Sequence, residues 1–458
     1  MDTIAAVSTA PGIGGIGIVR ISGENAFKVL NKVFKAKNPQ SIENITGYTI
    51  KYGKIINPED GKIVDEVLVS YFKAPNSDTT ENVYEINSHG GMIVVKKILE
   101  LVLENGARLA EAGEFTKRAF LNGRIDLSQV EAVIDIINAK TEKESRASVN
   151  QLEGNLSKEI KEIKNNVLNV LTDIEASIDY PEYDIEEISN NKTLNILENV
   201  EQSLKKLRDS FENGKIIKDG ITVAIIGKPN SGKSSLLNEL LKEERAIVTD
   251  IEGTTRDTIE EFVSINGIPF KFIDTAGIRN TENKVEQIGI EKSKKVASKS
   301  DLIIAMFDNS KKLSVEDKEI LNFIKDKKAI ILLNKIDLED KNLINEEEIK
   351  KVNKKVIKIS LSSELNLSDF YKELDKMFRL NEITADNEIL ITNLRHKKII
   401  EKAIKHTEEA KKDLQNGMPI DIISINIKSV LEDLAEITGE NVTEDILKDI
   451  FSKFCLGK

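Results

Sequence analysis

The segment that most restricts the fold is a glycine-rich loop between an apolar run and a helix-forming run. Residues 222–226 are apolar or β-branched, residues 227–234 follow the pattern Gly-x-x-x-x-Gly-Lys-Ser, and residues 235–238 suit a helix start. The backbone amides of such a loop can surround phosphate, Lys233 can reach the phosphate oxygens, and Ser234 can ligate Mg²⁺. We therefore predict a strand, a phosphate-binding loop and a helix in that order.

Further short apolar runs follow in this part of the chain, separated by stretches with helical spacing. They are residues 270–273, 302–306, 330–333 and 356–359. Apolar strands that alternate with helices are typical of a parallel sheet with helices on both faces. The sequence thus predicts an α/β P-loop domain at residues 215–380.

Two segments at the ends of later strands indicate which base is bound. Asn334, Lys335 and Asp337 belong to an Asn-Lys-Ile-Asp sequence, and Ser360, Leu361 and Ser362 end the next predicted strand. The carboxylate of Asp337 can accept both N–H groups of guanine, whereas adenine would leave it unpaired. We expect residues 360–362 to close over the base. The ligand is therefore expected to be GTP, and the domain a GTPase domain.

The remaining nucleotide contacts are expected at strand ends and in the loop between them. Thr255 is the most favoured threonine for a second Mg²⁺ ligand beside Ser234, because it lies between the phosphate-binding loop and the Asp-Thr-Ala-Gly segment. Besides residues 334–337 and 360–362, the expected contacts are Asn230, Ser231, Gly232, Lys233, Ser234, Ser235, Gly253, Thr254, Thr255, Asp274, Thr275, Ala276 and Gly277.

The usual water-orienting residue of small GTPases is missing, because residue 278 is isoleucine where they often carry glutamine. Lys233 can stabilise the transferring phosphate. Asn230 could add an oxygen ligand to a monovalent cation that lies along the phosphates, which would supply the positive charge that other systems take from arginine. A carboxylate could place the water, with Glu282 and Glu286 as the two candidates.

Composition limits the other classes of protein. The net charge is −11, so any contact with RNA must be local, since an acidic surface repels phosphate. One cysteine, Cys455, and three scattered histidines argue against disulfides and Cys- or His-based metal sites. No apolar run reaches the roughly 18 residues of a membrane span, and the start of the chain lacks the layout of a signal peptide. We therefore expect a cytoplasmic protein.

The regions that flank the GTPase domain differ in texture. Residues 1–122 mix turn signals with short β-rich runs, which predicts an α+β domain. Residues 123–214 and 381–458 show helical spacing of apolar residues. We predict a multidomain chain, in which one all-α helical domain is discontinuous and the α/β P-loop GTPase domain is inserted into it.

Three further segments carry a family resemblance, together with the end of the chain. Residues 3–12 read TIAAVSTAPG, residues 17–23 read GIVRISG, residues 113–127 read GEFTKRAFLNGRIDL, and the sequence ends in FCLGK. With the GTPase motifs, these segments resemble the MnmE (TrmE) family of tRNA-modifying GTPases from end to end. The resemblance implies a homodimer joined through N-terminal domains, each of which binds a one-carbon tetrahydrofolate, 5,10-methylene- or 5-formyl-tetrahydrofolate.

The resemblance also implies partners and a reaction. An MnmG-type protein, which brings FAD and uses NADH, would form a complex with the chain. Together they would add an aminomethyl or carboxymethylaminomethyl group to C5 of the wobble uridine of certain tRNAs, with GTP turnover driving the G domains together. No membrane is implied.

Individual site residues follow from the same resemblance. Potassium would be held by Asn230, Thr249, Ile251 and Thr254, and the loop of Thr249, Asp250, Ile251 and Glu252 would join the nucleotide site. The sequence VEQIGIE at residues 285–291 favours Glu286 over Glu282 as the water-orienting glutamate. The folate contacts carry over to Arg20, Glu85, Arg124 and Lys458. Cations suit the glutamyl carboxylates of folate, and a carboxylate can accept from pterin N–H groups.

Some features leave alternatives open. Arg20 and Arg124 could be surface charges, and Glu85 could pair with either of them. Cys455 is interpreted as a small buried apolar residue rather than a reactive thiol, since no neighbour in sequence lowers its pKa. Residues 78–82 depart from the family's usual Gly-Glu-Asp turn. A GTPase timer of RNA or ribosome assembly is the rival function, but neither flank is basic, and a dynamin-like remodeller would need a lipid-binding segment.

Overall fold

The computed structural model describes residues 2–38, 47–179, 186–243, 261–273, 297–338, 343–363, 365–383 and 389–458. These residues form two compact units, which are described separately. The first unit contains Met1–Ile134, Gln151–Tyr180 and Pro419–Lys458, and the second contains Asp135–Asn150 and Pro181–Met418. The predicted four-part division at residues 122, 214 and 380 stays a prediction.

A seven-stranded sheet forms the base of the first unit. Its strands are β1 (Ile4–Val7), β2 (Ile16–Ser22), β3 (Phe34–Ala36), β4 (Thr49–Ile56), β5 (Ile63–Phe72), β6 (Val83–His89) and β7 (Arg108–Leu109). The order is β3-β4-β5-β6-β2-β1-β7, antiparallel throughout except for the β1–β7 pair. Helices α1 (Ala26–Val33) and α2 (Met92–Glu104) complete the predicted α+β fold.

One face of this sheet is apolar and packed by helices, as the alternation along its strands requires. In β5, Val67 and Val69 are buried in the same cluster as Leu30 of α1 and Ile98 of α2. Leu68, which lies between the two valines, is exposed. The opposite face of the sheet, called the open face below, is exposed at Leu68 and carries the half-buried Arg20 and Glu85 between the buried residues of β2 and β6.

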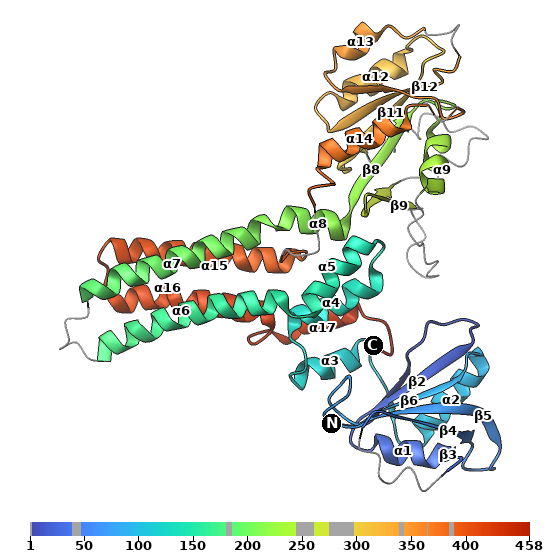
Figure 1. Cartoon of the computed structure of the whole chain (residues 1–458), viewed down its shortest axis with the longest axis vertical. Helices are drawn as coiled ribbons and strands as arrows, with labels where there is room; N and C mark the ends of the chain where they lie inside the picture. The colour runs from blue at the N-terminus through green and yellow to red at the C-terminus, as the bar shows by residue number, and fades with distance from the viewer. Residues whose placement is uncertain are drawn as a thin grey trace. The chain divides into compact units, whose positions relative to one another are not determined.

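Helices complete the first unit. They are α3 (Glu114–Leu121), most of α4 (Leu127–Asn138), α6 (Asn155–Asp179), α16 (Ile420–Thr438) and α17 (Glu444–Ser452). Helices α6 and α16 run side by side (Figure 1), and Lys164 forms an ion pair with Glu440 at 2.6 Å. Phe451 and Phe454 pack against Ala119 of α3. The chain end is thereby brought to the N-terminal domain.

The second unit contains the predicted α/β sheet. Its strands are β8 (Ile221–Gly227), β9 (Glu261–Ile265), β10 (Ile268–Phe272), β11 (Leu302–Asp308), β12 (Ala329–Asn334) and β13 (Lys355–Lys358), in the order β13-β12-β11-β8-β10-β9. Five strands are parallel, as predicted. Strand β9 was not predicted, because no apolar run marks it. It pairs antiparallel with β10 through a turn at Asn266 and Gly267, both of which have positive φ.

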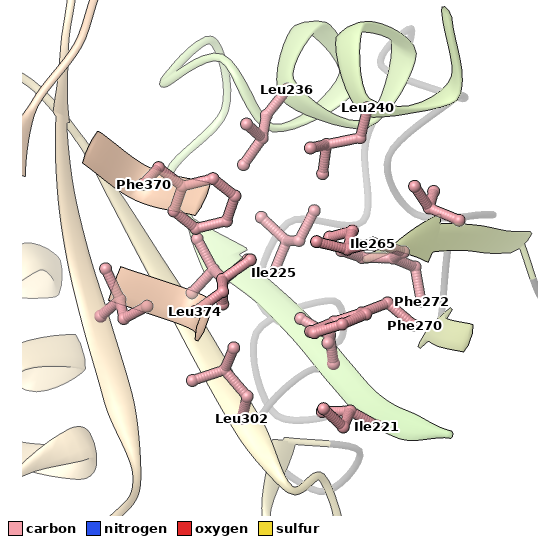
Figure 2. Packing of buried hydrophobic residues seen from close by; sticks show 14 of the residues in the cluster. Ile221, Ile225, Leu236, Leu240, Ile265, Phe270, Phe272, Leu302, Phe370 and Leu374 are labelled. Atoms are coloured by element: carbon pink, nitrogen blue, oxygen red, sulfur yellow. The ribbon is translucent and has the colours of Figure 1, made fainter. Parts of the chain in front are cut away.

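Helices cover both faces of this sheet. On one face, Leu236 and Leu240 of α9 (Lys233–Glu243) and Phe370 of α14 (Leu367–Phe378) point toward Ile225 and Phe270 (Figure 2). On the other face, α12 (Val315–Ile324) and α13 (Glu346–Lys350) pack against a second apolar cluster. Burial on both faces explains why β8, β10, β11 and β12 read as nearly continuous apolar runs.

The helices that remain in the second unit are α7 (Glu186–Asp209), α8 (Phe211–Asp219), α15 (Leu394–Gln415) and most of α5 (Glu142–Leu152). Helix α7 runs beside α15 (Figure 1), and Lys411 of α15 pairs with Glu201 of α7 at 2.8 Å. The predicted helical segments are therefore present. No helix in the described part of the chain is long and apolar enough to cross a membrane.

Candidate functional site: a nucleotide site and a charged cavity

The phosphate-binding loop lies between β8 and α9, where the sequence predicted it. Asn230 takes a left-handed conformation with φ 62°, which asparagine tolerates better than most residues. Gly232 has φ 109°, and a Cβ on it would lie 2.1 Å from Nδ2 of Asn334. The loop therefore requires glycine at this position, and its close approach to β12 leaves no room for a larger residue.

Lys233 begins helix α9 and turns back onto the loop. Its Nζ donates to the carbonyls of Gly227 and Lys228, both at 2.8 Å. Burial lowers the pKa of Lys233 to about 8, because the ammonium group loses hydration and no carboxylate among the described residues compensates. A bound phosphate would supply the missing counter-charge. The lysine, the loop amides and the N-terminus of α9 therefore fit a polyphosphate.

The residues predicted to bind the base lie at the ends of β12 and β13. Nδ2 of Asn334 donates to the carbonyl of Ser231 at 3.0 Å, and the amide of Leu361 donates to Oδ1 of Asn334 at 3.3 Å. Asn334 thus joins the phosphate-binding loop to the segment that follows β13. All these residues lie at the carboxyl edge of a parallel sheet, where such folds bind ligands.

Asp337 is held by the two serines that we expected to close over the base. Oγ of Ser360 donates to one carboxylate oxygen at 2.6 Å, and Oγ of Ser362 donates to the other at 3.0 Å. The hydrogen bond from Ser360 is the main cause that holds the pKa of Asp337 below its usual range. An ionised acceptor in a fixed orientation is what recognition of the guanine N–H groups requires.

One charged residue beside the predicted base-binding residues was missed. Asp308 ends β11 and pairs with Nζ of Lys335 at 2.7 Å. Lys335 has φ 70°, so this ion pair accompanies an uncommon backbone conformation directly beside the base-binding segment. The position of Asp308, at the carboxyl end of a predicted strand, is the signal that could have identified it.

Other predicted nucleotide residues lie outside the described residues. They are Thr249, Asp250, Ile251, Glu252, Gly253, Thr254, Thr255, Asp274, Thr275, Ala276, Gly277, Glu282 and Glu286. Their roles, including those in potassium and magnesium binding, stay predictions. Within the described part of the chain, no cluster of three or more His, Cys, Asp or Glu side chains could hold a metal ion.

A second candidate site lies in the first unit, on the open face of its sheet. A cavity of about 350 Å³ is lined by all four residues predicted to contact folate, Arg20, Glu85, Arg124 and Lys458. Its other lining residues are Phe72, Asp78, Val83, Thr116 and Val133. The cavity therefore combines three cationic side chains, two carboxylates and a partly apolar wall.

Arg20 and Glu85 meet because β2 and β6 pair in a register that sets them opposite each other. Nε of Arg20 donates to Glu85 at 2.9 Å, and the guanidinium group also lies 5.5 Å from the ring centre of Phe115. The side chain of Arg20 is only 16% exposed, so it is not a simple surface charge. The question of which arginine Glu85 contacts is settled in favour of Arg20.

The last residues of the chain reach this cavity through backbone hydrogen bonds. The amide of Phe115 donates to the carbonyl of Lys458 at 3.1 Å, and Oγ of Ser8 donates to the carbonyl of Gly457 at 3.0 Å. Cys455 is exposed, so the prediction of a buried apolar residue was wrong. Its carbonyl, rather than its thiol, contacts the domain by accepting from the amide of Gly113 at 3.4 Å.

A buried ionic network supports the loop at residues 78–82 beside the cavity. No sequence pattern predicted this network. Arg118 of α3 is almost fully buried and pairs with Glu81 at 3.0 Å, with Glu114 at 3.0 Å and with Asp2 at 2.7 Å. Oγ of Ser22 also donates to Glu81 at 2.7 Å. Since a buried charge must be paired, these contacts fix the loop against α3 and β2.

The parallel sheet, the phosphate-binding loop after β8 and the guanine-type acceptor after β12 together define a P-loop GTPase. Residues 127–455 match the family model described as the MnmE helical domain, and residues 3–124 match the model for the N-terminus of the GTP-binding protein TrmE. The chain belongs to the MnmE family.

Individual relatives agree with this assignment. The tRNA modification GTPase MnmE of Acetivibrio thermocellus is 51% identical over 457 residues, which is 100% of this chain and 99% of that protein. The protein with the same name from Clostridioides difficile is 51% identical over 459 residues, with 100% and 99% covered. Among solved structures, Era from Aquifex aeolicus is 28% identical and covers 41% of this chain and 66% of its own, with a TM-score of only 0.25.

Proposed function

We infer that the chain is a GTP-hydrolysing enzyme of tRNA modification, in which potassium-dependent GTP turnover drives chemistry on a wobble uridine. The nucleotide part rests on the phosphate-binding loop and on Asp337. Asn334 contacts Ser231 of the loop and the amide of Leu361, which lies between the two serines that donate to Asp337. Full-length similarity to proteins named tRNA modification GTPase supports the tRNA part. We place the enzyme in the cytoplasm.

The residues of the phosphate site divide the work of hydrolysis. Lys233 and the amides of residues 230–235 hold the polyphosphate, and Ser234 and Thr255 would ligate Mg²⁺, which neutralises charge on the phosphates when bound. Asn230, Thr249, Ile251 and Thr254 would ligate K⁺. Glu286 would orient the attacking water, because residue 278 is isoleucine and cannot do so. In this proposal, the potassium ion that Asn230 helps to hold supplies the positive charge that other GTPases take from arginine.

The cavity of the first unit would bind a one-carbon tetrahydrofolate. Its volume of about 350 Å³ suits a small ligand that is partly enclosed. Arg20, Arg124 and Lys458 offer cations to the glutamyl carboxylates, and Glu85 offers an acceptor to pterin N–H groups. Bound there, the folate would supply the one-carbon unit that the uridine receives.

We propose that the active species is a homodimer joined through this sheet. Ile50, Tyr52 and Leu68 are exposed on β4 and β5, and Tyr52 pairs directly with Leu68 across the two strands. Leu68 alternates with Val67 and Val69 of the helix-packed cluster, so it lies on the open face that carries Arg20 and Glu85. Its partner Tyr52 and, two residues away, Ile50 lie on the same face. An apolar face of this kind is better explained by a second copy than by solvent.

The uridine chemistry would require an MnmG-type partner that brings FAD and uses NADH, as membership of the MnmE family suggests. The product would be an aminomethyl or carboxymethylaminomethyl group at C5 of the wobble uridine. The tRNA contact must be local, because the chain carries a net charge of −11.

A binding measurement separates this function from that of a GTPase timer in RNA or ribosome assembly. We expect the full chain to bind 5-formyl-tetrahydrofolate saturably and Arg20→Ala to lose about a hundredfold in affinity, because one buried Arg–carboxylate contact disappears and Glu85 is left without its partner. GTP affinity should not change in this variant. Absence of saturable folate binding to the wild-type chain would favour the timer.

A further inference from the structure

Asp78 lines the cavity and contacts both Arg20 and Arg124. Its negative charge opposes binding of the carboxylates of the proposed ligand. Its carboxylate accepts from Arg20 Nη1 at 3.1 Å and from Arg124 Nη2 at 2.7 Å. Each oxygen is used by a different guanidinium group. The side chains of Asp78 and Arg124 are 40% and 39% exposed, so both remain accessible to a ligand that enters the cavity.

The backbone on the C-terminal side of Asp78 fixes this placement. Nδ2 of Asn122 donates to the carbonyl of Thr79 at 2.7 Å, and the hydroxyl of Thr79 lies 2.7 Å from that of Ser22. Thr80 takes a left-handed conformation with φ 61°, and Glu81 is held by Arg118. These contacts restrain the backbone that follows Asp78 and so keep its carboxylate near the two arginines.

The two arginines depend on Asp78 to different degrees. Arg20 is already oriented by Glu85 and Phe115, so Asp78 adds a counter-charge to it rather than a position. Among the described residues, Arg124 forms its ion pair with Asp78. A carboxylate of a ligand that approaches either guanidinium must therefore compete with a carboxylate that belongs to the protein.

We propose that Asp78 is a specificity-determining residue of this cavity, a built-in anion that competes with the carboxylates of the ligand for Arg20 and Arg124. The proposal rests on the proposed function in taking that ligand to be a tetrahydrofolate. Asp78 lowers the affinity for anions in general, so that binding requires the pterin contacts as well. The number of carboxylates on the ligand then determines how strongly Asp78 opposes binding.

The test is a titration of the full chain and of Asp78→Asn, which keeps the shape of the side chain and removes its charge. The probes are 5-formyl-tetrahydrofolate with one glutamyl residue, the same folate with three, and 6-methyl-tetrahydropterin, which has no carboxylate. At low salt we expect Asp78→Asn to bind the monoglutamate about threefold to tenfold more tightly and the triglutamate with a larger gain. The affinity for 6-methyl-tetrahydropterin should not change, and the gains should shrink in high salt.

Matched variants separate charge from structure. Asp60→Asn removes the same charge from an ion pair with Lys62 outside the cavity, and it should leave every affinity unchanged. Asp78→Glu restores the charge and should bind as the wild type does. Should Asp78→Asn fold poorly, as its thermal unfolding would show, Asp78→Ser provides the same comparison.

Two results would overturn the proposal: equal or weaker monoglutamate binding by Asp78→Asn, or an equal gain for 6-methyl-tetrahydropterin. If the wild-type chain binds no folate, the proposed function fails and a dicarboxylate, glutarate, becomes the probe. Tighter glutarate binding by Asp78→Asn would then still support a competing anion, and unchanged binding would refute it.

Discussion

Lys233 shows how a single residue is prepared for its ligand. Its ammonium group is buried against two loop carbonyls, and its pKa has fallen to about 8 because burial removes its hydration. Phosphate binding restores a counter-charge and therefore requires the protonated form. Affinity for GTP is thus linked to the protonation of this lysine.

The sign of the linkage follows from the lowered pKa. Below pH 8 the lysine is already charged and the affinity is at its maximum, whereas above pH 8 binding must take up a proton. We expect the dissociation constant for GTP to rise about fourfold between pH 7 and pH 8.5. Titration calorimetry in several buffers would measure it. Ser362→Ala removes one hydrogen bond to Asp337 and should leave the pH dependence of the dissociation constant unchanged. A dissociation constant that does not change with pH would refute the link between GTP binding and protonation of Lys233.

Asn230 carries the residue-scale prediction for potassium. Asn230→Ala should remove the stimulation of hydrolysis by K⁺, with a loss of at least about tenfold in turnover. The reason is that the site loses one oxygen ligand and, with it, the positive charge of the bound potassium ion. Asn266→Ala is a matched control, because Asn266 has a similar left-handed φ of 52° in the β9–β10 turn. Equal turnover of the wild-type chain in Na⁺ and K⁺ would contradict the prediction.

At the scale of elements, the end of the chain contributes to the cavity through its backbone. Gly457 has φ 87°, and a Cβ there would lie 2.1 Å from the carbonyl oxygen of Val7. Gly457→Ala should therefore displace Lys458 from the cavity and weaken 5-formyl-tetrahydrofolate binding about tenfold, through loss of a charged contact.

The control for this substitution is a glycine with similar backbone geometry and open space around it. Gly61 has φ 71°, and a Cβ added to it would meet no atom within 4 Å, so Gly61→Ala adds backbone strain without a clash. It should bind folate as the wild type does. If Gly457→Ala also binds normally, the tail does not place Lys458.

Elements with a strong local pattern could be predicted, and elements defined by distant contacts could not. The apolar runs identified β8, β10, β11 and β12, because burial on both faces leaves a nearly continuous signal. The run at residues 356–359 also identified β13, although both lysines of this edge strand are exposed. Strand β9 alternates buried and half-buried residues at the sheet edge, so it shows no such run. The exposure of Cys455 and the role of Asp78 depend on segments far apart in the sequence, whose meeting no local pattern reveals.

At the scale of the whole molecule, the proposed function links two sites in different parts of the chain. The GTP site lies in the second unit, and the charged cavity lies in the first. We propose that the two activities are linked through association of G domains in the homodimer, so neither site suffices alone.

The most direct test uses a variant that binds both ligands but does not hydrolyse GTP. Glu286→Ala should lower turnover about a hundredfold or more, because the attacking water loses its orienting carboxylate, while binding of GTP and 5-formyl-tetrahydrofolate stays normal. The measurement is the fraction of wobble uridine that carries the C5 modification in tRNA from cells in which this variant replaces the wild-type chain. We predict that the modification is lost, and modification at the wild-type level without hydrolysis would contradict the proposed coupling.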